Sequence, residues 1–375
     1  MSGTISWLHV GDLHMDEADG MISHARLERI VAEANTHLGD TVDFVFLPGD
    51  NANHATPAQY QAITGALAGL DRPWRIIPGD HDFEGGDLAA YECAIPEANR
   101  HEAEVIARHR CICIFLDIIS AGAGGPDFRL TMHHRSRLLR ELARAEAEGQ
   151  TPLVFMHAYP GDLAADADEI ARVFADTRVA FVDTGHTHYN KLLNDGRVVY
   201  GATRSTGQIE EGGGQAGFSI VTVHDTVPSW RFKTFGGEWP FVQIVGPADY
   251  RLVTRPADPR QVPRPGSVEI TAKIFGRIVE PVLLSAGGSD AVAMARVAGT
   301  SLWRASVTLP PGLHKVSVTA GNDRDTTRVL VRAADEVPRR AMPVAPGRDI
   351  HTIGAWPEHD IDGLQLGPNK NGMRL

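Results

Sequence analysis

Short apolar runs and helical patterns alternate along the first two-thirds of the chain. Five of the runs have β-strand character, and they cover residues 5–10, 42–47, 74–77, 153–155 and 179–182. Residues 22–38 and 134–148 instead carry apolar side chains at the three- and four-residue spacing of a helix that buries one face. This mixture of strands and helices predicts an α/β domain.

The pattern changes twice toward the C-terminus. Strand-like runs at 197–200, 218–223 and 241–245 have no helix between them, so we expect an antiparallel meander to end the first domain. Five prolines then crowd residues 247–265, which is typical of an extended linker. Beyond it, short alternating runs predict a small immunoglobulin-like β-sandwich without the cysteine pair. The predicted division is 1–246 for the first domain, 247–266 for the linker, 267–335 for the sandwich and 336–375 for a tail.

Composition and charge narrow the classes of protein to which the chain can belong. Its 375 residues, 43% hydrophobic and 22% charged, are typical of a globular protein. A formal charge of −11 argues against a broad footprint on a nucleic acid polymer. No apolar run reaches the roughly 18 residues of a membrane span and the start has no basic leader, so we expect a cytoplasmic protein without membrane contact. Of the three cysteines, Cys111 and Cys113 are expected to pack in the interior, with a Cys-x-Cys metal pair as the alternative.

Polar motifs follow the five predicted strands, at the point where each strand ends. They read Asp12-Leu13-His14, Gly49-Asp50-Asn51, Gly79-Asp80-His81-Asp82, Met156-His157 and Gly185-His186-Thr187-His188. Because ligands at the carboxyl ends of strands in an α/β sheet converge on one crevice, we expect these side chains to meet. Carboxylates and imidazoles bind hard metal ions, and a bridging carboxylate holds two of them about 3.5–4 Å apart. Asp50 is the natural bridge of such a pair.

In this order, the motifs resemble the signature of calcineurin-like metallophosphoesterases, over residues 4–245. The resemblance implies a four-layer α/β/β/α sandwich with a dinuclear metal centre that hydrolyses phosphoesters. It assigns Asp12, His14 and His188 to the first metal, Asp80, His157 and His186 to the second, and Asp50 to both. His81 resembles the imidazole that steadies the phosphoryl group or protonates the leaving oxygen, and Asp82 would orient that ring.

One ligand departs from the pattern of this family. Asp80 stands where the family has Asn, which raises the number of carboxylate ligands from two to three. A third carboxylate favours a more highly charged metal pair and lowers its Lewis acidity. We therefore expect two ions of Mn²⁺ or Fe²⁺/Fe³⁺, with Zn²⁺ as the alternative.

Ordinary structural roles compete with these assignments. Aspartates at the end of a strand, such as Asp12 and Asp50, often hydrogen-bond a local turn, and His157 also fits a core histidine. Asn51 and Arg204 are the candidates for substrate binding. The alternative for Asn51 is to cap the helix near residue 56, and the alternative for Arg204 is an ion pair at the surface.

The expected function is hydrolysis of a small phosphodiester by a metal-bound hydroxide. The spacing of the motifs resembles a bacterial branch that acts on cyclic nucleotides and glycerophosphodiesters. The alternatives are a phosphomonoesterase or phosphonate-ester hydrolase at the same site, and a non-catalytic metal-binding or interaction protein. The expected partner is a small phosphoester and not a nucleic acid polymer. The sandwich and tail are expected to act on the first domain, by forming a homo-oligomer or by laying residues 351–362 over the site.

Overall fold

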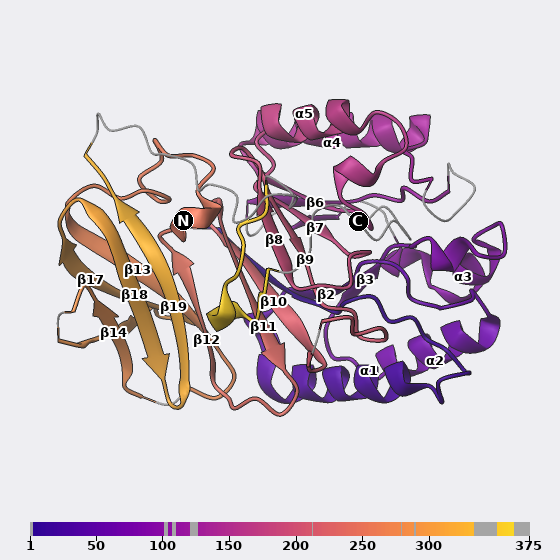
Figure 1. The fold of residues 1–375 in the computed structure, drawn as a ribbon, viewed down its shortest axis with the longest axis horizontal. Coiled ribbons are helices and arrows are strands. Elements are labelled where there is room, and N and C mark those ends of the chain that lie inside the picture. Colours follow the sequence, from indigo (N-terminus) through magenta and orange to yellow (C-terminus); the bar gives the residue numbers. More distant parts are fainter. Residues whose placement is uncertain are drawn as a thin grey trace.

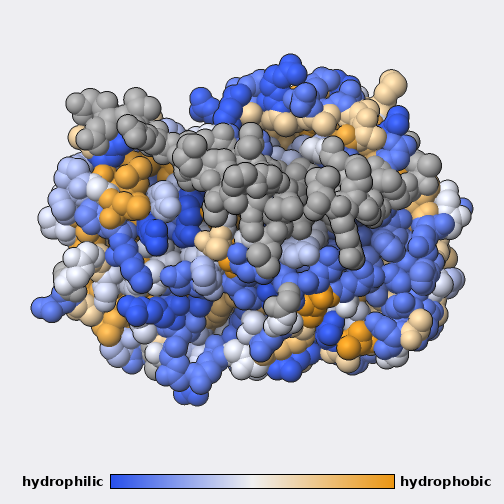
Figure 2. Space-filling model, in the orientation of Figure 1, coloured by the Kyte–Doolittle hydropathy of each residue, from blue (hydrophilic) through white to orange (hydrophobic). Residues whose placement is uncertain are grey.

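A computed structural model describes residues 3–100, 104–106 (backbone only), 110–120, 127–211, 213–278, 280–288, 290–333 and 351–363. Figure 1 shows a larger part with helices above and below the sheets, and an all-β part at its side. No helix within the described ranges is long and apolar enough to cross a membrane. The described residues on the face drawn in Figure 2 are mainly hydrophilic, with small hydrophobic patches between them.

The first sheet of the larger part has the strand order β11-β10-β1-β2-β3. Its parallel strands are β1 (Thr4–His9), β2 (Phe44–Leu47) and β3 (Trp74–Ile76), and the hairpin of β10 (Gly217–His224) and β11 (Val227–Thr234) lies antiparallel beside β1. Its helices are α1 (Ile22–Glu33), α2 (Pro57–Leu67) and α3 (Ala89–Ala94). The start of α2 is set by Thr56, whose hydroxyl accepts from the backbone of Gln59 in a capping box.

The second sheet has the order β4-β5-β6-β7-β9-β8. Its strands are β4 (Glu104–Ile106), β5 (Cys111–Phe115), β6 (Thr151–Phe155), β7 (Phe181–Thr184), β8 (Lys191–Asn194) and β9 (Val199–Ala202). Its helices are α4 (Met132–Glu148) and α5 (Ala167–Asp176). Short helical turns occupy Ala34–Leu38, Gly39–Thr41, His81–Phe83, Glu97–Asn99, Pro160–Asp162, Tyr250–Leu252 and Pro357–His359.

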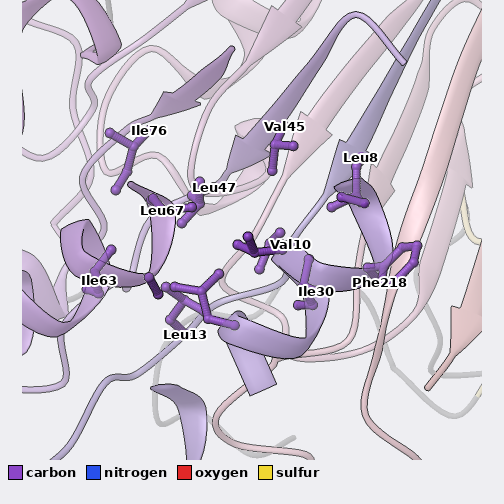
Figure 3. Packing of buried hydrophobic residues seen from close by; sticks show 14 of the residues in the cluster. Leu8, Val10, Leu13, Ile30, Val45, Leu47, Ile63, Leu67, Ile76 and Phe218 are labelled. Atoms are coloured by element: carbon purple, nitrogen blue, oxygen red, sulfur yellow. The ribbon is translucent and has the colours of Figure 1, made fainter. Parts of the chain in front are cut away.

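Three hydrophobic clusters hold these layers together. The two sheets pack face to face through aromatic side chains, with Trp7 of the first sheet against Phe155 and Phe181 of the second. The outer face of the first sheet packs on α1, α2 and α3, as Figure 3 shows for Ile30 of α1 and Ile63 of α2. The outer face of the second sheet packs on α4 and α5. The predicted four-layer α/β/β/α sandwich is confirmed.

The C-terminal part is a β-sandwich built on a core of its own. One sheet has the order β12-β13-β17-β16 and the other the order β15-β14-β18-β19. The bounds are β12 (Phe241–Gly246), β13 (Gly266–Phe275), β14 (Val282–Ala286), β15 (Val292–Ala293), β16 (Ala295–Arg296), β17 (Leu302–Leu309), β18 (Gly312–Ala320) and β19 (Asp323–Val331). With strands lettered in chain order, the sheets are A-B-E-D and C′-C-F-G, which is the immunoglobulin arrangement. This confirms the predicted sandwich.

The predicted meander at the end of the first domain is wrong. Its three runs form β9, β10 and β12, which lie in three different sheets. β9 pairs with β7 and β8, β10 pairs with β1 and β11, and β12 pairs with β13 of the sandwich. Strand pairing across such distances depends on tertiary packing, and local alternation of apolar residues does not specify it.

Lys273 of β13 is buried at the junction between the two parts, where its Nζ donates to Ser6 Oγ at 2.8 Å. Burial lowers the pKa of this ammonium group from 10.5 to about 8. The unfolded chain therefore holds this proton more tightly, and the free energy of unfolding rises with pH between those two values, by about 3 kcal/mol. We expect Lys273→Met to remove this rise, which is measured as the difference between the free energies of unfolding in urea at pH 7 and at pH 10. The exposed Lys315 of β18 supplies the control Lys315→Met, and an unchanged pH dependence in Lys273→Met would contradict the prediction.

Candidate metal centre

Seven Asp and His side chains from five separate loops meet at the carboxyl ends of β1, β2, β3, β6 and β7, and all are buried. They form two groups, in each of which one donor atom per residue lies within 4.8 Å of the others. The first group is Asp12, His14, Asp50 and His188, and the second is Asp50, Asp80, His157 and His186. Asp50 belongs to both groups, as a bridging ligand must.

The backbone at this site is unusual in two ways. Four of these residues have a positive φ between 41° and 65°, namely His14, Asp50, His186 and His188. Residues other than glycine adopt this conformation rarely, and it often marks functional sites. At Gly79 a Cβ atom would lie only 2.2 Å from Asp50 N, so only glycine allows the loop after β3 to approach the loop after β2. Both features restrict the backbone locally, and together they allow the loops to converge on one site.

In the first group, the donor atoms face one another. Nε2 of His14 lies 2.9 Å from Nε2 of His188 and 3.6 Å from Asp50 Oδ2. The Nδ1 of His14 donates to Asn53 Oδ1 at 3.1 Å, which leaves a lone pair on Nε2. Burial lowers the pKa of His14 to about 3, so the ring is neutral, as a metal ligand requires. Asp12 Oδ1 is buried without a hydrogen-bond partner among the described residues, which suits an atom reserved for a cation.

In the second group, the donor atoms are similarly close to one another. Asp80 Oδ1 lies 3.2 Å from His157 Nε2 and 3.4 Å from His186 Nδ1, and Asp50 Oδ1 lies 3.4 Å from His157 Nε2. His157 donates from Nδ1 to the Pro48 carbonyl at 2.8 Å, so its Nε2 also points inward. Burial disfavours the charged form of Asp50, but the charge of His157 and its hydrogen bond outweigh this effect and hold the pKa of Asp50 well below its usual range. These carboxylates and imidazoles fit a dinuclear metal centre.

His81 lies beside the two groups and is the most accessible of the motif residues, with 31% of its side chain exposed. Its ring centroid is 4.6 Å from that of His14, and its backbone N–H donates to Asp50 Oδ1 at 3.0 Å. Nδ1 of His81 donates to the Asn53 carbonyl at 2.9 Å. The other ring nitrogen is therefore available to a substrate.

A family model described as calcineurin-like phosphoesterase matches residues 5–190, the range that holds all seven of these residues. The chain belongs to the calcineurin-like phosphoesterase family. This membership and the buried Asp and His cluster together support metal-dependent hydrolysis of a phosphoester.

Solved structures with a similar fold include three that are 12% identical to this phosphoesterase. A dimetal phosphatase from Danio rerio covers 62% of this chain and 96% of its own, with a TM-score of 0.48. GAP50 of Plasmodium, described as the anchor in the inner membrane complex, covers 63% and 86%, with a TM-score of 0.45. A predicted phosphoesterase from Streptococcus pneumoniae covers 62% and 90%, with a TM-score of 0.32. No curated protein matches the sequence.

Asp82 does not orient His81 in this phosphoesterase, contrary to the role that the family resemblance implied. Its carboxylate is fully buried and accepts hydrogen bonds from the backbone N–H groups of Asn51, Ala52 and Gly79 at 2.9–3.1 Å. It also accepts from the hydroxyl of Tyr60 at 2.8 Å. Asp82 thus ties the loop after β2 to the loop after β3, and the Asn53 carbonyl holds His81 in its place.

We expect Asp82→Ala to lower the free energy of unfolding of the metal-free phosphoesterase by about 3 kcal/mol or more, because it leaves several buried donors without an acceptor. Tyr60→Phe removes only one of these hydrogen bonds and is expected to cost about 1 kcal/mol. Urea unfolding of both variants measures the difference. If Asp82→Ala were no less stable than Tyr60→Phe, Asp82 would not be the tie between the loops.

The two predicted substrate-binding residues are both buried. Asn51 is buried, and its Nδ2 donates to the carbonyl of Ile77 and to Asp82 at 2.9 Å; it does not cap α2, which begins at Thr56. Arg204 is also buried, and it donates to Glu211 and to Asp360. Arg204 and the Nδ2 of Asn51 are engaged within the protein, whereas the Oδ1 of Asn51 is buried without a hydrogen-bond partner among the described residues. Substrate binding by these two residues stays a prediction that none of these contacts supports.

Two residues outside the predicted set of ligands, Asn53 and Glu210, orient the candidate ligands. Asn53 holds His14 through its side chain and His81 through its carbonyl. Its position two residues after Asn51 was the only signal for this role. Glu210 approaches His188 Nδ1 at 3.3 Å, and no motif marks it. Such partners fix the ring orientation and raise the basicity of histidine ligands.

Proposed function

We propose that the protein hydrolyses small phosphodiesters with a pair of metal ions held by Asp12, His14, Asp50, Asp80, His157, His186 and His188. The observation that carries the proposal is the sharing of Asp50 between two buried groups of donors beside an accessible imidazole, His81. Two bound ions supply Lewis acidity and positive charge at the phosphoryl group. The three carboxylates, with Asp80 as the third, favour Mn²⁺ or Fe²⁺/Fe³⁺ over softer ions.

His81 is suited to hand a proton to the leaving oxygen. Burial lowers its pKa, but Asp50, the Asn53 carbonyl and Asp80 act in the other direction, and the net shift in the pKa of His81 is upward. In the metal-free protein, a raised pKa favours the imidazolium, which is the form that a general acid must have. The hydrogen bond from Nδ1 to Asn53 keeps the second nitrogen turned toward the substrate.

The charges around the site support a diester over a monoester. Glu84 approaches His81 at 3.8 Å, and Glu210 lies beside His188, each with nearly half of its side chain exposed. Arg204, the cation that could have bound a phosphate, is held by Glu211 and Asp360 instead. A phosphomonoester carries a charge of about −1.5 to −2 at pH 7, whereas a diester carries about −1. An acidic rim repels the monoester more strongly.

The test compares bis(p-nitrophenyl) phosphate with p-nitrophenyl phosphate. Protein stripped of metal with a chelator is reloaded with Mn²⁺, Fe²⁺ or Zn²⁺, and initial rates are measured for both compounds. We expect faster turnover of the diester and the highest rates with Mn²⁺ or Fe²⁺. A preference for the monoester with every metal would overturn the diester proposal, and absence of turnover in protein with two bound ions would overturn hydrolysis itself.

A further inference from the structure

The segment 351–363 lies between the sandwich and the phosphoesterase domain, and Figure 1 shows it in yellow beside β8 and β11. It extends the edge of the second sheet, because the N–H of Asn194 donates to the His351 carbonyl at 2.7 Å and the N–H of Ile353 donates to the Leu192 carbonyl at 3.2 Å. Trp356 is buried, with the guanidinium of Arg251 3.5 Å from its ring centroid. The segment is therefore an integral part of the fold.

This segment ends in a polar cluster built around Arg204. Asp360 Oδ2 accepts from Arg204 Nη1 at 2.9 Å, and Glu211 accepts from Arg204 Nε. Asn190 joins all three, since its Oδ1 accepts from the N–H of Arg204, its N–H donates to Glu211 and its Nδ2 donates to the Asp360 carbonyl, at 2.8–3.0 Å. Asp360 lies 156 residues from Arg204 in the chain.

The loop that Arg204 begins supports two candidate metal ligands directly. Thr206 N–H donates to the Asp12 carbonyl at 2.9 Å, and Ser205 N–H donates to the His188 carbonyl at 3.2 Å. Further along the same loop, Glu210 approaches His188 Nδ1. The loop is packed so closely that a Cβ atom on Gly11 would lie 2.0 Å from the Arg204 carbonyl oxygen. A shift of Arg204 therefore moves the supports of Asp12 and His188.

We propose that Asp360 is a positioning residue for the first metal site. Its carboxylate fixes Arg204, Arg204 fixes the loop 204–211, and the loop sets the positions of Asp12 and His188. The second group of donors lies one step further from Asp360, because it meets these supports through the N–H of His186, which donates to Asp12 Oδ2 at 2.7 Å. The inference rests on the proposed metal centre, but it concerns metal binding and does not require that the natural substrate be a diester.

The test measures binding of Mn²⁺ alone to the full chain, by calorimetry and by electron paramagnetic resonance. In Asp360→Asn we expect the affinity of one site to fall about tenfold, the scale of losses that follow removal of an outer partner of a ligand. Affinity at the other site is expected to fall by much less, and at limiting Mn²⁺ the signal should shift from a coupled pair to an isolated ion. Asp360→Glu keeps the carboxylate and should restore most of the lost affinity.

Glu358→Gln is the matched control, because Glu358 is an exposed carboxylate of the same segment. Binding of both ions by Asp360→Asn with wild-type affinity would overturn the inference. An equal loss at both sites together with a lower melting temperature of the metal-free protein would also overturn it, because that result indicates a general structural role. If the wild-type protein binds two ions but hydrolyses neither test compound, the proposed function fails, while the comparison of Mn²⁺ affinities still decides the role of Asp360.

Discussion

We expect Asp50→Ala to abolish binding of the metal pair and to lower hydrolysis of a phosphodiester by about a thousandfold or more. Asp50 is the only described residue that appears in both groups of donors, with Oδ1 3.4 Å from His157 Nε2 and Oδ2 3.6 Å from His14 Nε2. Its loss therefore removes a ligand from each ion at once. Metal ions stabilise charge in the transition state by several kcal/mol, and each 1.36 kcal/mol is about tenfold in rate.

Metal content by mass spectrometry and turnover of bis(p-nitrophenyl) phosphate check this expectation together. Asp71→Asn changes an exposed aspartate in the loop before β3 and serves as the control with the wild-type metal content. A variant Asp50→Ala that retained two ions per chain would show that Asp50 does not bridge them. Retained turnover after loss of both ions would show that the observed hydrolysis does not depend on the metal centre.

The convergence of the seven donors could be predicted because it depends on a local rule. Each motif directly follows a strand, and the carboxyl ends of parallel neighbours in a sheet lie on one edge. The spacing of Asp12 and His14, or of His186 and His188, then needs only one turn of backbone to bring both side chains inward. The positive φ of His14, Asp50, His186 and His188 is the conformation that makes these turns. Asp and His adopt it more often than most residues, but this preference does not say at which positions it occurs.

The roles that could not be predicted are those of residues whose hydrogen-bond partners lie far away in the sequence. Arg204 was expected to bind substrate or to form a surface ion pair, but its partner Asp360 comes from a segment without helical or strand periodicity. Asp82 was assigned by analogy to its neighbour His81, whereas its hydrogen bonds reach back to residues 51 and 52 and to Tyr60 of α2. A buried carboxylate takes whichever donors the tertiary structure supplies, and spacing along the sequence does not reveal them.

The position of the C-terminal part also changes how the site is understood. Residues 351–362 were expected to lie over the site. In the structure, Asp360 of this segment instead binds Arg204, and the loop that Arg204 begins contacts His188. His359 of the same segment approaches Asp325 of β19 at 2.8 Å, which ties the sandwich to this contact. The sandwich and the metal centre are thus connected through the segment 351–363. Substitutions on either side of this segment are therefore expected to weaken metal binding at the first site.

His81→Ala is expected to lower kcat for a phosphodiester by about 10²–10⁴-fold while both metal ions stay bound, the scale that general acid catalysis contributes. The side chain of His81 appears in neither group of donors, and its ring faces the accessible side of the site. Loss of the imidazole therefore removes the proton donor without removing a ligand. Turnover of bis(p-nitrophenyl) phosphate and metal content are measured on the same Mn²⁺-loaded samples.

His54→Ala is the matched control, since His54 is an exposed histidine on the same rim, paired with Glu84 at 2.7 Å, and is expected to change kcat by less than about tenfold. A compound with a better leaving group needs less help from an acid, so the loss in His81→Ala should shrink as the pKa of the leaving alcohol falls. A loss of the same size for every leaving group would assign His81 to binding the phosphoryl group. Loss of metal in His81→Ala would place His81 among the supports of Asp50, to which its backbone N–H already donates.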